Sequence, residues 1–125
     1  MVSRKLDRLD EMFLSQEEFM YDLKETGFPD FPLDLTQKDS FAFLRDVGTR
    51  AVEEIFEALS HLKAGKPWRS DQNSWDRDAF IEELVDAQRF LLEVLILAGV
   101  SSEEFMGAFD EKVAITRDRL QRELM

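Results

Sequence analysis

The sequence contains no cysteine and a single histidine, His61. Disulfide bonds, thiolate metal sites and a cysteine nucleophile are therefore excluded, and one histidine cannot build a His-rich zinc site. Basic residues are also few, with 16 lysines and arginines against 27 aspartates and glutamates and a formal net charge of −11. Because binding to nucleic-acid phosphates requires clustered basic side chains, this balance argues against a nucleic-acid-binding protein.

Long apolar runs are lacking as well. The longest, residues 94–100, is far too short to span a bilayer. The N-terminal residues are charged from the start and have no apolar core like that of a signal peptide. A chain of 125 residues has the size of one domain that can bury a real core. We therefore expect a single domain over residues 1–125 that is soluble, cytoplasmic and independent of membranes.

Four segments carry apolar side chains at helical spacing, and glycine- and proline-containing stretches separate them. Gly99 is a suitable C-terminal cap for the third segment, and Ser101 with Glu104 matches a capping box at the start of the fourth. Because strand-like alternation is lacking, the sequence predicts an all-α fold, arranged as a four-helix bundle. The approximate bounds of the predicted helices are residues 4–24, 40–62, 76–98 and 101–124.

The third predicted helix is apolar on most of its sides, which is typical of a buried helix. One small bundle offers too little surface to cover it. We therefore expect the chain to form a homodimer or a homotetramer. The apolar residues in question are Phe80, Ile81, Leu84, Val85, Phe90, Leu91, Leu92, Val94, Leu95, Ile96 and Leu97.

Two of the predicted helices each carry a pair of acids one turn apart. Glu54 and Glu57 share one helix face, and Glu83 and Asp86 share another. If the helices pack side by side, four carboxylates converge and repel one another. Mg²⁺ relieves this repulsion because it prefers carboxylate, water and phosphate oxygens as ligands. A nucleoside triphosphate would complete the coordination, and the metal could then activate bound water.

The alternative interpretation is a solvated acidic surface, since glutamate-rich helix faces are common without any metal. One acidic pair on one helix is weak support for a site. Two pairs, each flanked by core-type residues, are stronger support. A non-catalytic acidic helical module that binds a partner protein therefore remains the competing hypothesis.

The order of the acids resembles the all-α NTP pyrophosphatase superfamily, which includes MazG-type enzymes and dimeric dUTPases. That superfamily carries E-x-x-E on one helix and E-x-x-D on the next, as do Glu54–Glu57 and Glu83–Asp86 here. Glu53 completes the E-E-x-x-E form of MazG-type members. The long connection between the two motifs is more similar to the dimeric dUTPase branch.

Three further features are similar to that branch. Gln16 lies on the first predicted helix, where the family carries an early glutamine. Lys66 and Trp68 stand in the loop before the third predicted helix, as a lysine and a tryptophan do in the family. Lys112 and Arg119 are spaced on the last predicted helix like its K-x-x-x-N-x-x-R motif.

The resemblance implies an enzyme, a nucleotide pyrophosphohydrolase that cleaves a dNTP to the monophosphate and pyrophosphate. The favoured substrate is dUTP, with dCTP, a purine dNTP or a damaged nucleotide as alternatives. Glu54, Glu57, Glu83 and Asp86 would hold Mg²⁺, for which Mn²⁺ can substitute. Catalysis is assigned to Glu54 and to Glu53, which would support the ligands or orient the attacking water.

The resemblance also implies the residues that bind the substrate. Lys112 and Arg119 would contact the phosphates, although an ordinary charged helix end is the alternative. Gln16 and Trp68 would face the nucleoside, although Trp68 could instead pack the loop onto the bundle. Arg89 would contribute to the nucleoside site.

Three positions depart from the dUTPase pattern. Phe19 stands where those enzymes carry an asparagine, and Arg89 stands where they carry a histidine, two positions that help to read uracil. Thr116 replaces the asparagine of the phosphate motif. Arg89 could bind a different base, grip a phosphate or simply pair with Glu93 one turn later. The identity of the base is therefore less certain than the phosphate chemistry.

Overall fold

The computed structural model describes residues 4–62 and 75–124. Within these ranges the chain forms helices and no strand, which confirms the all-α prediction. None of the described helices is both long enough and apolar enough to cross a membrane. The elements are α1 (Arg8–Asp22), the 3₁₀ helix η1 (Leu23–Thr26), α2 (Lys38–Leu59), α3 (Arg77–Leu97) and α4 (Ser102–Leu124).

The helix ends are determined by local capping groups. Gly99 adopts a φ of 79°, the left-handed conformation that favours glycine after a helix C-terminus. Ser101 caps α4, because its Oγ accepts a hydrogen bond from the backbone N–H of Glu104 at 3.1 Å. The predicted glycine cap is confirmed, and of the predicted capping box the Ser101 half is confirmed, whereas the reciprocal hydrogen bond to the Glu104 side chain does not form among the described residues. A capping box formed by Asp7 and Asp10 starts α1 and was not predicted.

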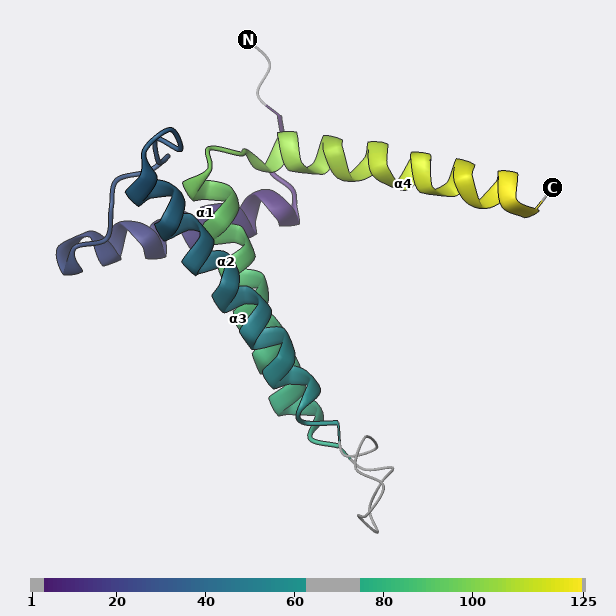
Figure 1. The fold of residues 1–125 in the computed structure, drawn as a ribbon, viewed down its shortest axis with the longest axis horizontal. Helices are drawn as coiled ribbons and strands as arrows, with labels where there is room; N and C mark the ends of the chain where they lie inside the picture. The colour runs from purple at the N-terminus through teal and green to yellow at the C-terminus, as the bar shows by residue number, and fades with distance from the viewer. Residues whose placement is uncertain (1–3, 63–74, 125) are drawn as a thin grey trace.

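The central unit of the fold is the hairpin of α2 and α3, which lie side by side along most of their length (Figure 1). Helix α1 crosses this hairpin near the end of α3 and packs against it. The core lies at this crossing because all three helices contribute apolar side chains there. Its buried members are Phe13, Met20, Val47, Leu92, Ile96 and Leu97.

The connection between η1 and α2 covers one side of this core. Phe28 and Phe31 pack against the buried cluster, and the ring of Phe28 meets that of Phe43 edge-on at 5.6 Å. The backbone N–H of Leu33 donates to the carbonyl of Leu97 at 2.7 Å, which ties the connection to the end of α3. These contacts position the rings of Phe28 and Phe43 beside the cavity described below.

Helix α4 extends away from the rest of the chain (Figure 1). Among the described elements it contacts only α1, and none of its residues is buried. At its start, Asp10 accepts hydrogen bonds from the guanidinium of Arg4 and the hydroxyl of Ser102, which hold the pKa of Asp10 well below its usual range. The predicted four-helix bundle is therefore not closed within one chain, because α4 does not reach α2 or α3.

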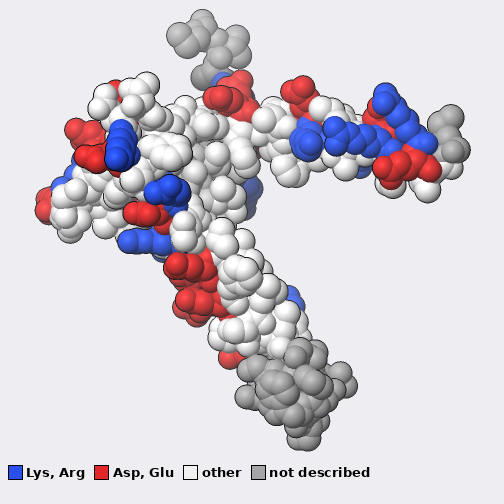
Figure 2. All heavy atoms as spheres, in the orientation of Figure 1, with Lys and Arg blue, Asp and Glu red and all other residues white. Residues whose placement is uncertain are grey.

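The two sides of the hairpin differ in character. Acidic side chains gather along one side of it in Figure 2, and uncharged surface covers much of the other side in that view. The expected burial of α3 holds for its C-terminal half, whereas its N-terminal half is largely exposed within one chain. A shallow apolar cavity of about 530 Å³ opens on this hairpin, and its lining is Gly48, Ala51, Val52, Ile55, Leu84, Ala87, Gln88, Leu91 and Val94.

Candidate metal and nucleotide site

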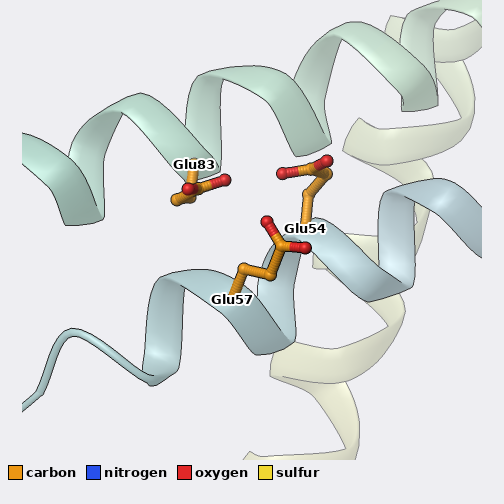
Figure 3. Close-up of side chains that lie close together, drawn as sticks. All are labelled: Glu54, Glu57 and Glu83. Carbon is orange, nitrogen blue, oxygen red and sulfur yellow. The ribbon is translucent and has the colours of Figure 1, made fainter.

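Three of the four predicted metal-binding acids converge between α2 and α3 (Figure 3). Glu54 and Glu57 project from α2, Glu83 projects from α3, and one carboxylate oxygen of each lies within 4.8 Å of the others. The two helices produce this arrangement because residues three apart share a face and the faces meet in the hairpin. Asp86 lies one turn further along α3 from Glu83 and does not belong to the closest group.

The surroundings of Glu54 in this cluster raise its pKa. A hydrogen bond with Glu83 raises the pKa of Glu54 to about 7, and desolvation and the charges of Glu57, Glu83 and Asp86 act in the same direction. The two carboxyl groups can therefore share a proton near neutral pH. A divalent cation can replace such a proton, because it supplies the positive charge that the oxygens require. Glu54 and Glu83 are half-buried and Glu57 is exposed, so solvent ions can reach the group.

A cavity of about 520 Å³ adjoins the acids and is enclosed by α1, α2 and α3. Glu54 and Asp86 contribute to its wall, so the cavity and the acid cluster share Glu54. Elsewhere the wall combines phenylalanine rings with charged and polar side chains. This aromatic and charged part of the lining consists of Gln16, Phe19, Phe28, Phe43, Asp46, Arg50, Arg89, Phe90 and Glu93.

Two predicted nucleoside-binding residues meet in this cavity. The Nε of Arg89 donates to the Oε1 of Gln16 at 3.4 Å, and the guanidinium lies 4.7 Å above the ring of Phe19. Arg89 thus bonds across to α1, and no ion pair between Arg89 and Glu93 forms among the described residues. The alternative in which Arg89 only pairs with Glu93 on the helix surface is therefore wrong.

Other predicted site residues lie elsewhere. Lys112 and Arg119 are exposed on α4 and do not line the cavity of the same chain. Glu53 is exposed and belongs neither to the acid cluster nor to the cavity wall. Lys66 and Trp68 lie outside the described residues. The predicted roles of these five residues remain predictions.

Sequence reasoning missed three charged residues of the cavity, Asp46, Arg50 and Glu93. All three follow the helical repeat of the acids, and Asp46 lies four residues before Arg50. Arg50 precedes Glu54 by four residues on α2, and Glu93 follows Asp86 by seven residues on α3. Extending the face of each acidic pair by one or two turns toward the core would have found them.

No family model matches the chain, and searches of the curated proteins and of the solved structures found no match. The resemblance to the all-α NTP pyrophosphatase superfamily therefore rests on the quoted motifs.

Proposed function

We propose that this protein is a Mg²⁺-dependent pyrophosphohydrolase that cleaves a nucleoside triphosphate to the monophosphate and pyrophosphate. The observation that carries the proposal is the position of the acid cluster at the wall of a cavity large enough for a nucleoside. Acids alone are common on helices, and aromatic cavities alone are common in cores. Their junction at Glu54, with Asp86 also in the cavity wall, supports a metal-binding group next to a pocket for a base.

The residues of the cluster fit a magnesium ion, since they offer hard carboxylate oxygens from two helices and leave room for water and phosphate. Glu54, Glu57 and Glu83 would hold it, with Asp86 available one turn away. When bound, the ion would polarise the phosphoryl group and acidify bound water. In the reaction, the oxygen of water bonds to the α-phosphorus. The bond between the α-phosphorus and the oxygen that bridges it to the β-phosphorus breaks, and pyrophosphate leaves. The proton of the water passes to a carboxylate of the cluster, since Glu53, to which the resemblance gives this role, is exposed outside both the cluster and the cavity wall.

A cation for the phosphates is present within the chain. Arg50 lines the cavity one turn before Glu54, where its guanidinium can reach phosphate oxygens held near the acids. Lys112 and Arg119 would act at the same site only if a second copy brought its α4 to the hairpin.

Such a second copy would also explain the exposed apolar surfaces. Ile55, Leu84 and Leu91 are exposed on the hairpin, and Phe109 is exposed on α4. A homodimer or homotetramer that covers these faces would close the bundle that one chain leaves open. This assembly is part of the proposal.

Release of pyrophosphate from a panel of dNTPs with Mg²⁺ tests the proposal. We expect Glu54→Gln and Asp86→Asn to lower kcat/KM by about a hundredfold or more, since groups merely supporting a metal ligand already contribute about tenfold to hundredfold. Glu82→Gln is the matched control, because Glu82 is exposed beside Glu83 and lies outside the cluster. Full activity in Glu54→Gln would contradict the site assignment.

Thermal melting distinguishes the enzyme from the acidic interaction module. A bound ion and nucleotide stabilise the folded state by mass action. We expect Mg²⁺ with a non-hydrolysable dNTP to raise the Tm of the natural sequence and to leave that of Glu54→Gln nearly unchanged. An unchanged Tm in both proteins, together with no pyrophosphate release, would favour the interaction module.

A further inference from the structure

The cavity contains a buried acid that the proposed hydrolysis does not use. Glu93 exposes only 6% of its surface, yet it forms no hydrogen bond and no ion pair with any described residue. Burial raises its pKa, and the nearby charges of Arg50 and Arg89 oppose this rise. Among the described residues no fully buried side-chain oxygen lacks a hydrogen-bond partner, so the carboxylate oxygens of Glu93 are open to the cavity. A ligand that offers adjacent donors can therefore bond to this carboxylate inside the cavity.

Arg89 lies one turn before Glu93 on the same helix and offers complementary groups. Its Nε donates to Gln16 and its guanidinium lies over the ring of Phe19, and these two contacts orient the guanidinium. Its two Nη groups have no hydrogen-bond partner among the described residues. The cavity wall thus presents a fixed pair of donors and, about 6 Å along the helix, a pair of acceptors.

These groups lie at a suitable distance from the acid cluster. Asp86 and Glu93 both line the cavity and are separated by roughly 10 Å along the axis of α3. A sugar and a base attached to an α-phosphate near Asp86 can bridge that separation. Aromatic rings of Phe28, Phe43 and Phe90 line the same space and offer stacking surfaces for a base.

We propose that the cavity selects guanine, so that the substrate of the proposed hydrolysis is a guanine nucleoside triphosphate. This inference rests on the proposed function. Guanine is the base that carries two adjacent donors, N1–H and the 2-amino group, and two adjacent acceptors, O6 and N7. The donors match the carboxylate of Glu93 and the acceptors match the Nη groups of Arg89. None of uracil, thymine, cytosine and adenine carries both of these pairs.

The two contacts can be tested with modified nucleotides that each lack one group. We expect the natural sequence to hydrolyse dGTP with a higher kcat/KM than dATP, dCTP, dTTP or dUTP. The kcat/KM for dGTP should exceed that for dITP, which lacks the 2-amino group, by about tenfold to hundredfold. It should exceed that for 7-deaza-dGTP, which lacks N7, by a similar factor. Faster hydrolysis of dUTP or dATP than of dGTP would overturn the assignment of guanine and leave the hydrolytic function standing.

Variants assign each contact to its residue. In Glu93→Gln the preference for dGTP over dITP should vanish, and the preference for dGTP over 7-deaza-dGTP should persist. In Arg89→Lys the preference over 7-deaza-dGTP should vanish, and the preference over dITP should persist. Melting curves check that both variants fold. The comparison of dGTP with its two analogues on the natural sequence does not depend on the variants. Unchanged preferences in folded variants would overturn the assignment.

A binding measurement separates this inference from the hydrolysis. Titration calorimetry compares dGMP with dIMP, neither of which can be hydrolysed to pyrophosphate. Tighter binding of dGMP that depends on Glu93 supports the guanine pocket even in a protein that releases no pyrophosphate. Equal binding of the two monophosphates overturns the inference, whatever the outcome of the activity assay.

Discussion

The α2–α3 hairpin and α4 contain similar types of residues, but only the hairpin packs these residues into a site. Both are amphipathic, and both expose charged and large apolar side chains. In the hairpin, packing of two helices turns acids on separate segments into a cluster and adds a cavity beside it. On α4, Lys112 and Arg119 remain exposed because no described element lies opposite them. Residue type is therefore insufficient for a site, and juxtaposition across helices is required.

The largest expected difference between the two regions is in how much each contributes to the free energy of unfolding. Leu97 of α3 is fully buried, whereas Phe109 of α4 is 55% exposed. We expect Leu97→Ala to lower the free energy of unfolding by about 2–5 kcal/mol, because it leaves a cavity in the core. Phe109→Ala should change it by no more than about 0.5 kcal/mol in the isolated chain. Urea denaturation measures both values, and a larger, concentration-dependent loss for Phe109→Ala would show that α4 packs on a second copy.

The two regions also differ in their expected contribution to phosphate binding. Because charge-assisted hydrogen bonds are stronger than neutral ones, we expect Arg50→Ala to raise KM for the nucleotide by about tenfold. Arg45→Ala is the control, since Arg45 lies on the same helix over the ring of Phe41 and outside the cavity. Steady-state kinetics should show a smaller effect for Arg119→Ala. An equal effect would place α4 of a partner copy at the cavity.

A smaller effect concerns pH. Glu54 has a pKa of about 7 in the folded chain, above its usual value, so its protonated form stabilises the fold. Without metal this stabilisation is present at acidic pH and is lost as the pH rises through 7. We therefore expect Tm to fall between pH 6 and pH 8, and Mg²⁺ to raise Tm more at pH 8 than at pH 6.

Glu54→Gln is the control for this titration, because the amide cannot ionise. Burial also raises the pKa of Glu93, so part of the fall in Tm should remain in that variant. A pH dependence that is identical in both proteins would show that Glu54 does not contribute.

Local features of the fold were predictable from the sequence. Glycine after a helix and serine before one act through their own backbone and side-chain groups, so Gly99 and Ser101 could be assigned as caps. The spacing of the acidic pairs was equally informative, because residues three apart share a helix face wherever the helix packs. The position of α4 was not predictable, since its apolar side chains fit a bundle of one chain or of several.

Sequence by itself determined the helices, their caps and the pairing of acids on each of two faces, because these depend on neighbours within one or two helical turns. Only the tertiary structure decided that Glu83 meets Glu54, that Arg89 binds Gln16 instead of Glu93, and that Glu93 faces a cavity without a partner among the residues described. Those outcomes depend on which helix faces pack together. That choice follows from the fit of all apolar side chains at once, which no local spacing specifies.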